Sequence, residues 1–329
     1  MPLINRCGGG GGTPQLCGQV ENLKARLGNL SVILSWTAPS PDEDNSFVGA
    51  RIVRKTGSAP TGINDGTVVY EGTSLTYTDT GLTAGTTYYY RAFAYNAKKK
   101  YQTEYRVINI TAMAIQPNFA DNTWDVIIEA CHTDSVPDTW VTTDSKTMTI
   151  GGKSYHVDII GKNHDTYTAG GIAPLTFGLH DCYGTKSNMN SSNTNSTGWN
   201  GSKMRTETLP AILAKMPENI QNGIRAVNKR TATSGSSGTI KTTSDKLFTF
   251  SEMEVYGGTT YSYSGEGKQY DYYKAGNSKV KKVGSTNSRW WLRSPGAYNG
   301  DIFCAVNADG SINSSGASNS YGVCFGFCF

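Results

Sequence analysis

The chain ends on a regular alternation in which Val323, Phe325, Phe327 and Phe329 are each separated by one residue. Successive side chains of a strand point to opposite faces, so a period of two predicts a strand with one buried face. A chain end frays unless something holds it, and four buried apolar side chains would anchor this one. The sequence therefore predicts that the C-terminus is a core strand.

A second apolar run, Trp290–Leu292, is too short for a helix and bulky enough for a buried strand. From Gly296 to Ser320 the chain consists mostly of Gly, Ala, Ser, Asn and Asp, with a few larger residues between them. The two apolar runs predict a frame of aromatic strands. The small-residue stretch between them predicts a displayed loop.

Composition indicates a loop-rich, mostly β protein. The 329 residues are 37% hydrophobic and 17% charged and include 38 glycines. This length suffices for two domains, each with its own core. The formal net charge is only +4, and the largest basic cluster is Lys98–Lys100. We therefore expect no nucleic-acid partner, and because no apolar run approaches membrane-spanning length, no membrane insertion.

Residues 1–17 include five consecutive glycines and are flexible by composition. They contain neither the apolar segment nor the cleavage site of a secretory signal. Two interpretations remain open, an attachment peptide that orders on a partner and a loose chain end. The chain is expected to reach its destination without the secretory route.

Residues 18–115 show an all-β pattern. Val32, Leu34 and Trp36 alternate along one predicted strand, and a turn with two prolines follows. Further short apolar runs recur at close intervals with turn residues between them. Short strands at this spacing are typical of a β-sandwich.

This segment resembles a fibronectin type III domain. The resemblance rests on Trp36 in the second strand and on Leu82 and Gly85, which lead to Tyr88 where that family places its tyrosine corner. It implies that alternate side chains from Tyr90 to Ala94 face the core. Because the loop that follows has no Arg-Gly-Asp sequence, we interpret the module as a spacer.

Residues 119–329 predict an α+β domain. Apolar residues at helical spacing predict one helix that begins near Thr123 and another that begins near Thr208. The pair Gly151-Gly152 lies between two alternating runs and predicts a β-hairpin. The polar tracts of the domain, 187–195 and 231–243, are expected to be loops folded against the core.

Patterns for catalysis and metal binding are missing from the sequence. The chain has four histidines, His132, His156, His164 and His180. Their spacing matches no metal motif, and no nucleophile elbow, phosphate loop or dinucleotide fingerprint occurs. Glu252 and Glu254 alternate with apolar residues and are expected on one solvated strand face, although a catalytic carboxylate pair is conceivable. We expect no enzyme activity, no cofactor and no metal.

The chain has seven cysteines, an odd number, and no Cys-x-x-Cys pair. This pattern favours reduced thiols over a disulfide framework.

The second domain is similar to an uncharacterised family that is common in gut Firmicutes and their prophages and often follows fibronectin-type modules in phage structural proteins. The motifs that carry the similarity are Asn190–Asn195, Lys203–Arg205, Leu209–Leu213, Thr243–Phe248, Trp290–Pro295 and Tyr321–Phe327.

The ending also resembles C-type-lectin-fold proteins, which include the variable proteins of diversity-generating retroelements and relatives of the formylglycine-generating enzyme. In the variable proteins, adenine-directed mutagenesis of Asn codons changes display positions, and mutation of the first two bases of these codons cannot produce Lys, Glu, Gln, Met or Trp. None of these five occurs from Gly296 to Phe329, which fits a diversified surface and equally a small-residue loop. The resemblance implies ligand-binding residues at Ala297, Tyr298, Asn299, Asp301, Phe303, Cys304, Ala305, Asn307 and Asn313.

These resemblances lead us to expect a phage virion protein of the tail or capsid surface. Residues 1–17 would attach to other virion proteins, and residues 119–329 would bind a glycan or protein receptor on the bacterial surface. A homotrimer is expected by family analogy alone. The alternative is a secreted or cell-surface adhesin. A third hypothesis, an oxidase-like enzyme, lacks a convincing active cysteine pair.

Overall fold

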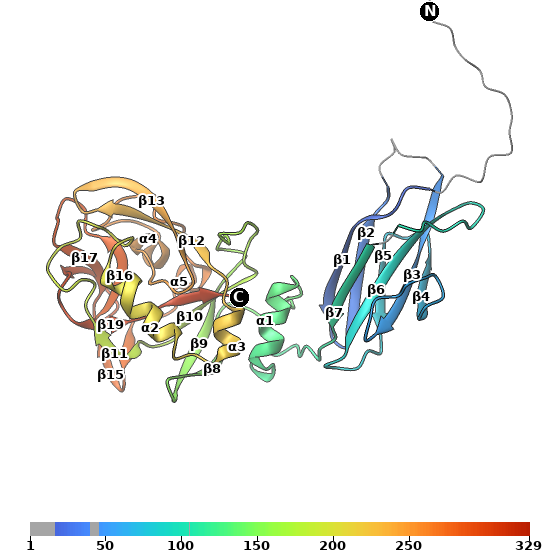
Figure 1. The fold of residues 1–329 in the computed structure, drawn as a ribbon. Helices are drawn as coiled ribbons and strands as arrows, with labels where there is room; N and C mark the ends of the chain where they lie inside the picture. The colour runs from blue at the N-terminus through green and yellow to red at the C-terminus, as the bar shows by residue number, and fades with distance from the viewer. Residues whose placement is uncertain (1–16, 40–45, 105) are drawn as a thin grey trace, which may run out of the picture. The chain divides into compact units, whose positions relative to one another are not determined.

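A computed structural model describes residues 17–39, 46–104 and 106–329. The chain divides into two compact units, Met1–Ile115 and Gln116–Phe329 (Figure 1). The division lies between the two domains expected from the sequence, residues 18–115 and 119–329. Of the expected attachment peptide, residues 1–17, only Cys17 belongs to the described residues.

The first unit is a β-sandwich in its described part (Figure 1). Strands β1, β2 and β5 form one sheet, and the other has the order β4-β3-β6-β7. The strands are β1 (Glu21–Gly28), β2 (Ser31–Thr37), β3 (Phe47–Thr56), β4 (Thr67–Gly72), β5 (Thr76–Thr80), β6 (Thr87–Asn96) and β7 (Arg106–Thr111).

The core of this sandwich confirms the fibronectin type III-like fold. Trp36 is buried, and the Tyr88 hydroxyl accepts a hydrogen bond from the Thr83 backbone N–H at 3.1 Å, which is the contact of a tyrosine corner. Tyr90 and Ala92 are fully buried, as the alternation predicted. Most residues of β6 are buried on both faces, and β6 lies between β3 and β7 in the sheet.

The second unit combines short helices with several sheets (Figure 1). The main sheets have the orders β20-β10-β9-β8 and β11-β19-β16-β17-β18, and β12-β13 and β14-β15 are separate hairpins. The helices are η1 (Phe119–Asp121), α1 (Trp124–His132), the π-helical turn η2 (Met204–Thr208), α2 (Leu209–Leu213), α3 (Glu218–Gly223), α4 (Glu252–Tyr256) and α5 (Asp271–Lys274). The strands are β8 (Ser145–Ile150), β9 (Lys153–Lys162), β10 (Leu175–Leu179), β11 (Tyr183–Ser187), β12 (Val227–Ser234), β13 (Ser237–Asp245), β14 (Lys281–Val283), β15 (Thr286–Ser288), β16 (Trp290–Pro295), β17 (Ile302–Val306), β18 (Ile312–Gly316), β19 (Tyr321–Val323) and β20 (Gly326–Cys328).

Several local predictions are confirmed. Helix α1 begins after Thr123, whose side chain accepts a hydrogen bond from the Val126 N–H. The predicted hairpin is β8-β9, and both glycines of its turn have positive φ, 58° at Gly151 and 78° at Gly152, which favours glycine at these positions. No helix in the described ranges has the length and apolar character needed to span a membrane.

The C-terminus is buried, as predicted, but it is not one strand with one buried face. The chain pairs first as β19, parallel to β16, and then as β20, antiparallel to β10. Every residue from Val323 to Phe329 is buried because other elements cover both faces. The Phe327 ring stacks on Phe177 at 5.3 Å, and the backbone of Gly326 also bridges to Phe248.

Two other predictions were wrong. The tract 231–243 is not a loop, because β12 and β13 pair over it, and its threonines suit strands through their branched side chains. Glu252 and Glu254 do not lie on a solvated strand. They lie in α4, where Ser251 and Glu254 form a capping box, and both glutamates are buried.

Candidate functional site

The loop between β16 and β17 carries the most exposed aromatic side chain of the described residues. Tyr298 is 91% exposed, Asn299 and Asp301 are exposed, and Ala297 is half-buried. The predicted display positions at the start of the small-residue stretch therefore lie on the surface.

The prediction of a ligand-binding role is wrong for three other residues. Phe303, Cys304 and Ala305 are buried, because β17 pairs with β16 on one side and β18 on the other and its faces are covered. Asn307 and Asn313 are half-buried and bond to each other, with the Asn313 amide 2.9 Å from Asn307 Oδ1. Asn307 follows β17 whereas the exposed loop precedes it, so these asparagines do not join the loop in one site.

Tyr298 has a backbone conformation that side chains rarely adopt. Its φ is +61°, in the left-handed region that costs a non-glycine residue roughly 1–2 kcal/mol. Such strain persists only where the surrounding structure imposes it, and it is common at functional sites. The contacts of the loop show what imposes it.

Asn195 is a fully buried side chain that clamps this loop. Its Nδ2 donates to the carbonyls of Asn299 and Ile302, both at 2.7 Å. Its backbone N–H donates to the Gly300 carbonyl at 2.6 Å, and its Oδ1 accepts from the Gly235 N–H at 3.0 Å. One asparagine thus ties the displayed loop to the turn of the β12-β13 hairpin.

Position 235 requires glycine because the hairpin turn and the displayed loop approach each other closely there. A Cβ atom at this position would lie 1.9 Å from the Asn299 carbonyl oxygen and 2.4 Å from that of Gly296. Any side chain would therefore push the hairpin turn away from the displayed loop.

Two further tyrosines border Tyr298. The rings of Tyr263 and Tyr298 meet edge to face at 5.4 Å, and the Tyr263 hydroxyl donates to the Gly235 carbonyl. Tyr261 is 38% exposed, and its carbonyl accepts from the Ala297 N–H at 2.6 Å. We call Tyr261, Tyr263, Tyr298, Asn299 and Asp301 the tyrosine surface.

The buried side chain of Glu252 holds the segment that carries Tyr261. The buried Glu252 carboxylate accepts hydrogen bonds from the backbone N–H groups of Thr260 at 2.5 Å, Tyr261 at 3.1 Å and Ser262 at 2.8 Å. The Glu252 N–H in turn donates to Ser294 Oγ at 2.9 Å. These bonds connect the tyrosine surface to strand β16.

Strand β16 also carries the centre of a buried charge cluster. Arg293 is fully buried, and its guanidinium donates to both oxygens of Glu254, at 2.5 and 2.8 Å. Glu254 Oε1 also lies 2.7 Å from Lys229 Nζ, which reaches Asp165 Oδ1 at 2.7 Å. Glu266 completes the cluster and contacts Ser294 Oγ. We call Asp165, Lys229, Glu254, Glu266 and Arg293 the charge cluster.

The two glutamates of the charge cluster respond differently to burial. Burial alone would raise the pKa of Glu254, but the adjacent Arg293 and Lys229 cations outweigh it and hold this pKa below its usual value. Glu266 accepts the Ala232 N–H at 2.8 Å and forms no ion pair with another described residue, and burial raises its pKa to about 7. Glu252 and Glu254, the pair considered for catalysis, are each engaged in structural contacts.

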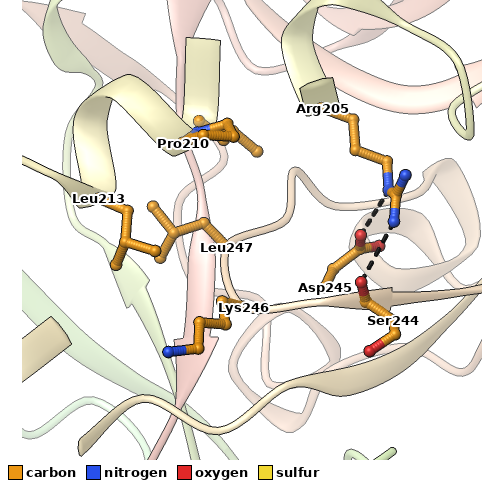
Figure 2. A pocket seen from close by; sticks show the side chains of 8 residues that line it. Arg205, Pro210, Leu213, Ser244, Asp245, Lys246 and Leu247 are labelled. Atoms are coloured by element: carbon orange, nitrogen blue, oxygen red, sulfur yellow. Dashed lines mark hydrogen bonds and ion pairs between the residues drawn. The ribbon is translucent and has the colours of Figure 1, made fainter. Parts of the chain in front are cut away.

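The cavity in Figure 2 illustrates a satisfied ion pair. It encloses about 230 Å³, and Arg205 donates to Asp245 at 2.5 Å on one side, opposite the side chains of Pro210, Leu213 and Leu247. Asp245 also accepts from Trp199 Nε1 at 2.9 Å, so the pair anchors the segment before η2 to β13. These contacts indicate a structural role.

The described residues offer neither a metal site nor an activated thiol. Among the described residues, no group of three or more His, Cys, Asp or Glu side chains could hold a metal ion. Cys131, Cys182, Cys304, Cys324 and Cys328 are buried free thiols. Burial raises the pKa of Cys324 to about 11 and that of Cys328 well above its usual value, which is the opposite of thiol activation.

Sequence reasoning missed the residues that hold the tyrosine surface in place. Asn195 belongs to a motif that was recognised without a role, and Gly235 lies in a tract interpreted as a loop. Tyr261 and Tyr263 alternate in the chain, which was a usable signal for a shared face. Nothing in the sequence pairs them with Tyr298.

Comparisons with known proteins describe parts of the chain. Residues 174–328 match a family described as a domain of unknown function, DUF6273. No curated protein matches the chain.

Three solved structures are similar to parts of the chain. The fibronectin type III domain of human fibronectin type III domain containing protein 3 is 18% identical with a TM-score of 0.27, over 34% of this chain and 100% of that one. An Fn3-like protein from Clostridium thermocellum is 23% identical with a TM-score of 0.23, over 30% of this chain and 97% of that one. The spore cortex lytic enzyme SleM of Clostridium perfringens is 13% identical with a TM-score of 0.24, over 29% of this chain, and the match spans 28% of SleM's own length.

Proposed function

We propose that this protein is a phage virion protein that binds a receptor on the bacterial surface through the tyrosine surface of its second unit. The observation that carries the proposal is Tyr298, which is 91% exposed and held at φ +61° by the contacts around it. Apart from the ring contact with Tyr263, the Tyr298 side chain faces solvent, so the free protein gains little from this strain. Because the loop is already rigid, a ligand that contacts Tyr298 would not have to order it, and less conformational entropy would be lost on binding.

The composition of the tyrosine surface supports recognition. Tyrosine offers a large contact area at low conformational cost, and Asn, Ser and Gly supply adaptable hydrogen bonds. Tyr298 and Asn299 would make direct contact, with Asp301 at the edge. The first unit serves as a spacer, and residues 1–17 attach the chain to other virion proteins.

The proposal includes a C-type-lectin-like fold for the second unit and diversification of its displayed loop by a retroelement. Diversification must spare buried positions. Related phage genomes should therefore differ at Tyr298, Asn299 and Asp301 and keep Phe303 and Cys304, which are buried. Changes scattered evenly across the exposed and buried positions would refute diversification.

The test of receptor binding uses the fluorescently labelled full chain and cells of the bacterium that carries the gene. Tyr298→Ala should weaken binding about tenfold, as expected for a central aromatic contact. Val141→Ser is the matched control, since Val141 is also an exposed apolar side chain, at 47%, on a different loop. Equal binding by wild type and Tyr298→Ala would refute the role of the surface.

Location is tested separately by mass spectrometry of purified virions and of cell-wall fractions. The proposal expects the chain in virions. Recovery in cell walls alone would replace the virion assignment with the surface adhesin and leave the tyrosine surface as its binding site.

A further inference from the structure

A separate cavity of about 360 Å³ lies at the edge of the β20-β10-β9-β8 sheet. Two neighbouring strands, β8 and β9, contribute to its lining together with His180, which follows the end of β10. Ser145 on β8 pairs with Asp158 on β9, and Asp158 pairs with Gly178 on β10, two residues before His180. None of these residues belongs to the tyrosine surface or to the charge cluster.

The cavity contains a histidine oriented by a carboxylate. His180 Nδ1 lies 2.7 Å from Asp158 Oδ2, and the His180 side chain is 54% exposed whereas that of Asp158 is 5% exposed. The acceptor Asp158 keeps the proton on Nδ1, so Nε2 of the neutral ring remains available to accept a hydrogen bond. This bond, which is the largest influence, raises the pKa of His180. Asp158 thus holds the His180 ring in one orientation, with Nε2 available to a polar ligand.

Two features of the lining reduce the stability of the empty protein. Ser145 Oγ is buried and has no hydrogen-bond partner within the described ranges. Thr143 has a φ of +91°, which is a genuine outlier for a β-branched residue. Buried hydroxyls are normally paired, and backbone strain is typical of ligand sites. Both features lie on the same cavity wall.

The chemistry of the lining selects a neutral polar ligand. Protonated His180 is balanced by Asp158, and the buried Lys281 ammonium donates to the carbonyls of Leu179 and His180, at 2.7 Å each. These two cations are therefore engaged within the protein, and the lining adds a second imidazole, His156, and the ring of Tyr272. An apolar ligand would leave the Ser145 hydroxyl unpaired.

We propose that this cavity binds one neutral sugar residue, with His180 and Ser145 as direct hydrogen-bond partners. Each sugar hydroxyl can donate and accept, which matches hydroxyl, imidazole and amide groups, and Asn277 supplies the amide. The volume is within the range of small-ligand sites, on the order of 300–1,000 Å³, and near its lower end. The site is independent of the tyrosine surface.

Calorimetry and saturation-transfer NMR with the full chain test the proposal. The probes are glucose, galactose, N-acetylglucosamine and, as an anionic comparator, glucose 6-phosphate. At least one neutral sugar should bind and glucose 6-phosphate should bind more weakly. His180→Ala should weaken sugar binding about tenfold and lower the melting temperature slightly, because the buried Asp158 carboxylate loses its partner, and Tyr298→Ala should leave sugar binding unchanged.

Ser145→Ala gives a signature that a purely structural role would not produce. It removes an unpaired buried hydroxyl, so the melting temperature of the empty protein should rise, while sugar affinity falls about fivefold.

Three results would overturn the proposal: no binding of any of the neutral sugars, tighter binding of glucose 6-phosphate than of every neutral sugar, or sugar binding that survives His180→Ala. If Tyr298→Ala abolished sugar binding and His180→Ala did not, the sugar would bind at the tyrosine surface. That result would refute the cavity and support the proposed function.

Discussion

Strand β16 carries Arg293 of the charge cluster, and the loop that follows β16 carries Tyr298 of the tyrosine surface. The two regions treat polar groups in opposite ways. The charge cluster buries ionised groups and satisfies them with each other, as Arg293 does with Glu254. The tyrosine surface exposes Tyr298 in a strained conformation. The difference indicates that the buried charge cluster stabilises the fold, whereas the displayed loop spends part of that stability on a strained conformation that serves recognition.

The largest expected effect comes from removing the central cation. Arg293→Met leaves Glu254 buried with one cation fewer, and loss of one partner from a buried pair costs about 4 kcal/mol. Urea denaturation of the full chain measures the loss in the free energy of unfolding. Arg289→Ala is the control, because Arg289 is exposed and its change should cost below about 1 kcal/mol. Equal effects of the two variants would show that the charge cluster does not support the fold.

A smaller effect, dependent on pH, is expected at Glu266. Its folded-state pKa of about 7 exceeds the ordinary 4.5, so the folded protein binds more protons between these values and loses stability as pH rises from 4.5 to 7. Asp165 and Glu254 have lowered pKa values and act oppositely, with stability lost as pH falls.

Glu266→Gln keeps the shape of the side chain and removes its titration. The stability of this variant relative to wild type should increase by about 3 kcal/mol between pH 4.5 and pH 8. Denaturation at a series of pH values measures this difference. A constant difference across that range would contradict the raised pKa.

The next effect concerns the clamp of the displayed loop. Asn195→Ala leaves the Gly235 N–H and the Asn299 carbonyl without their partner, at a cost of about 2 kcal/mol. Amide hydrogen exchange at Gly235 should become faster. Asn193→Ala is the matched control, since Asn193 is an exposed asparagine of the same segment that bonds Ser318, and it should change exchange at Gly235 little. Unchanged exchange in Asn195→Ala would show that the loop does not depend on the clamp.

The sequence predicted the elements whose side chains repeat with a clear period. Trp36 and Tyr88 identified the first unit, and the apolar runs identified β16 and the buried C-terminus. The exposed and buried halves of the small-residue stretch could not be separated, because Tyr298 and Phe303 are similar in size and only strand pairing decides which is buried.

The charge cluster could not be predicted from the sequence either. Asp165, Lys229 and Arg293 are far apart in the chain, and charged residues are normally exposed unless they are paired. The capping box at Ser251 and Glu254 was a readable helix signal that the alternation of Glu252 and Glu254 concealed. Local rules therefore failed where tertiary contacts supply the partner.

The most direct test of the central claim combines stability and binding in one variant, Tyr298→Gly. Glycine adopts a φ of +61° without strain, so the variant should be more stable than wild type by about 1 kcal/mol. Binding of the same purified variant to cells of the bacterium that carries the gene should fall about tenfold. A variant that is more stable and binds as well as wild type would contradict the claim that Tyr298 is held in its strained conformation for recognition.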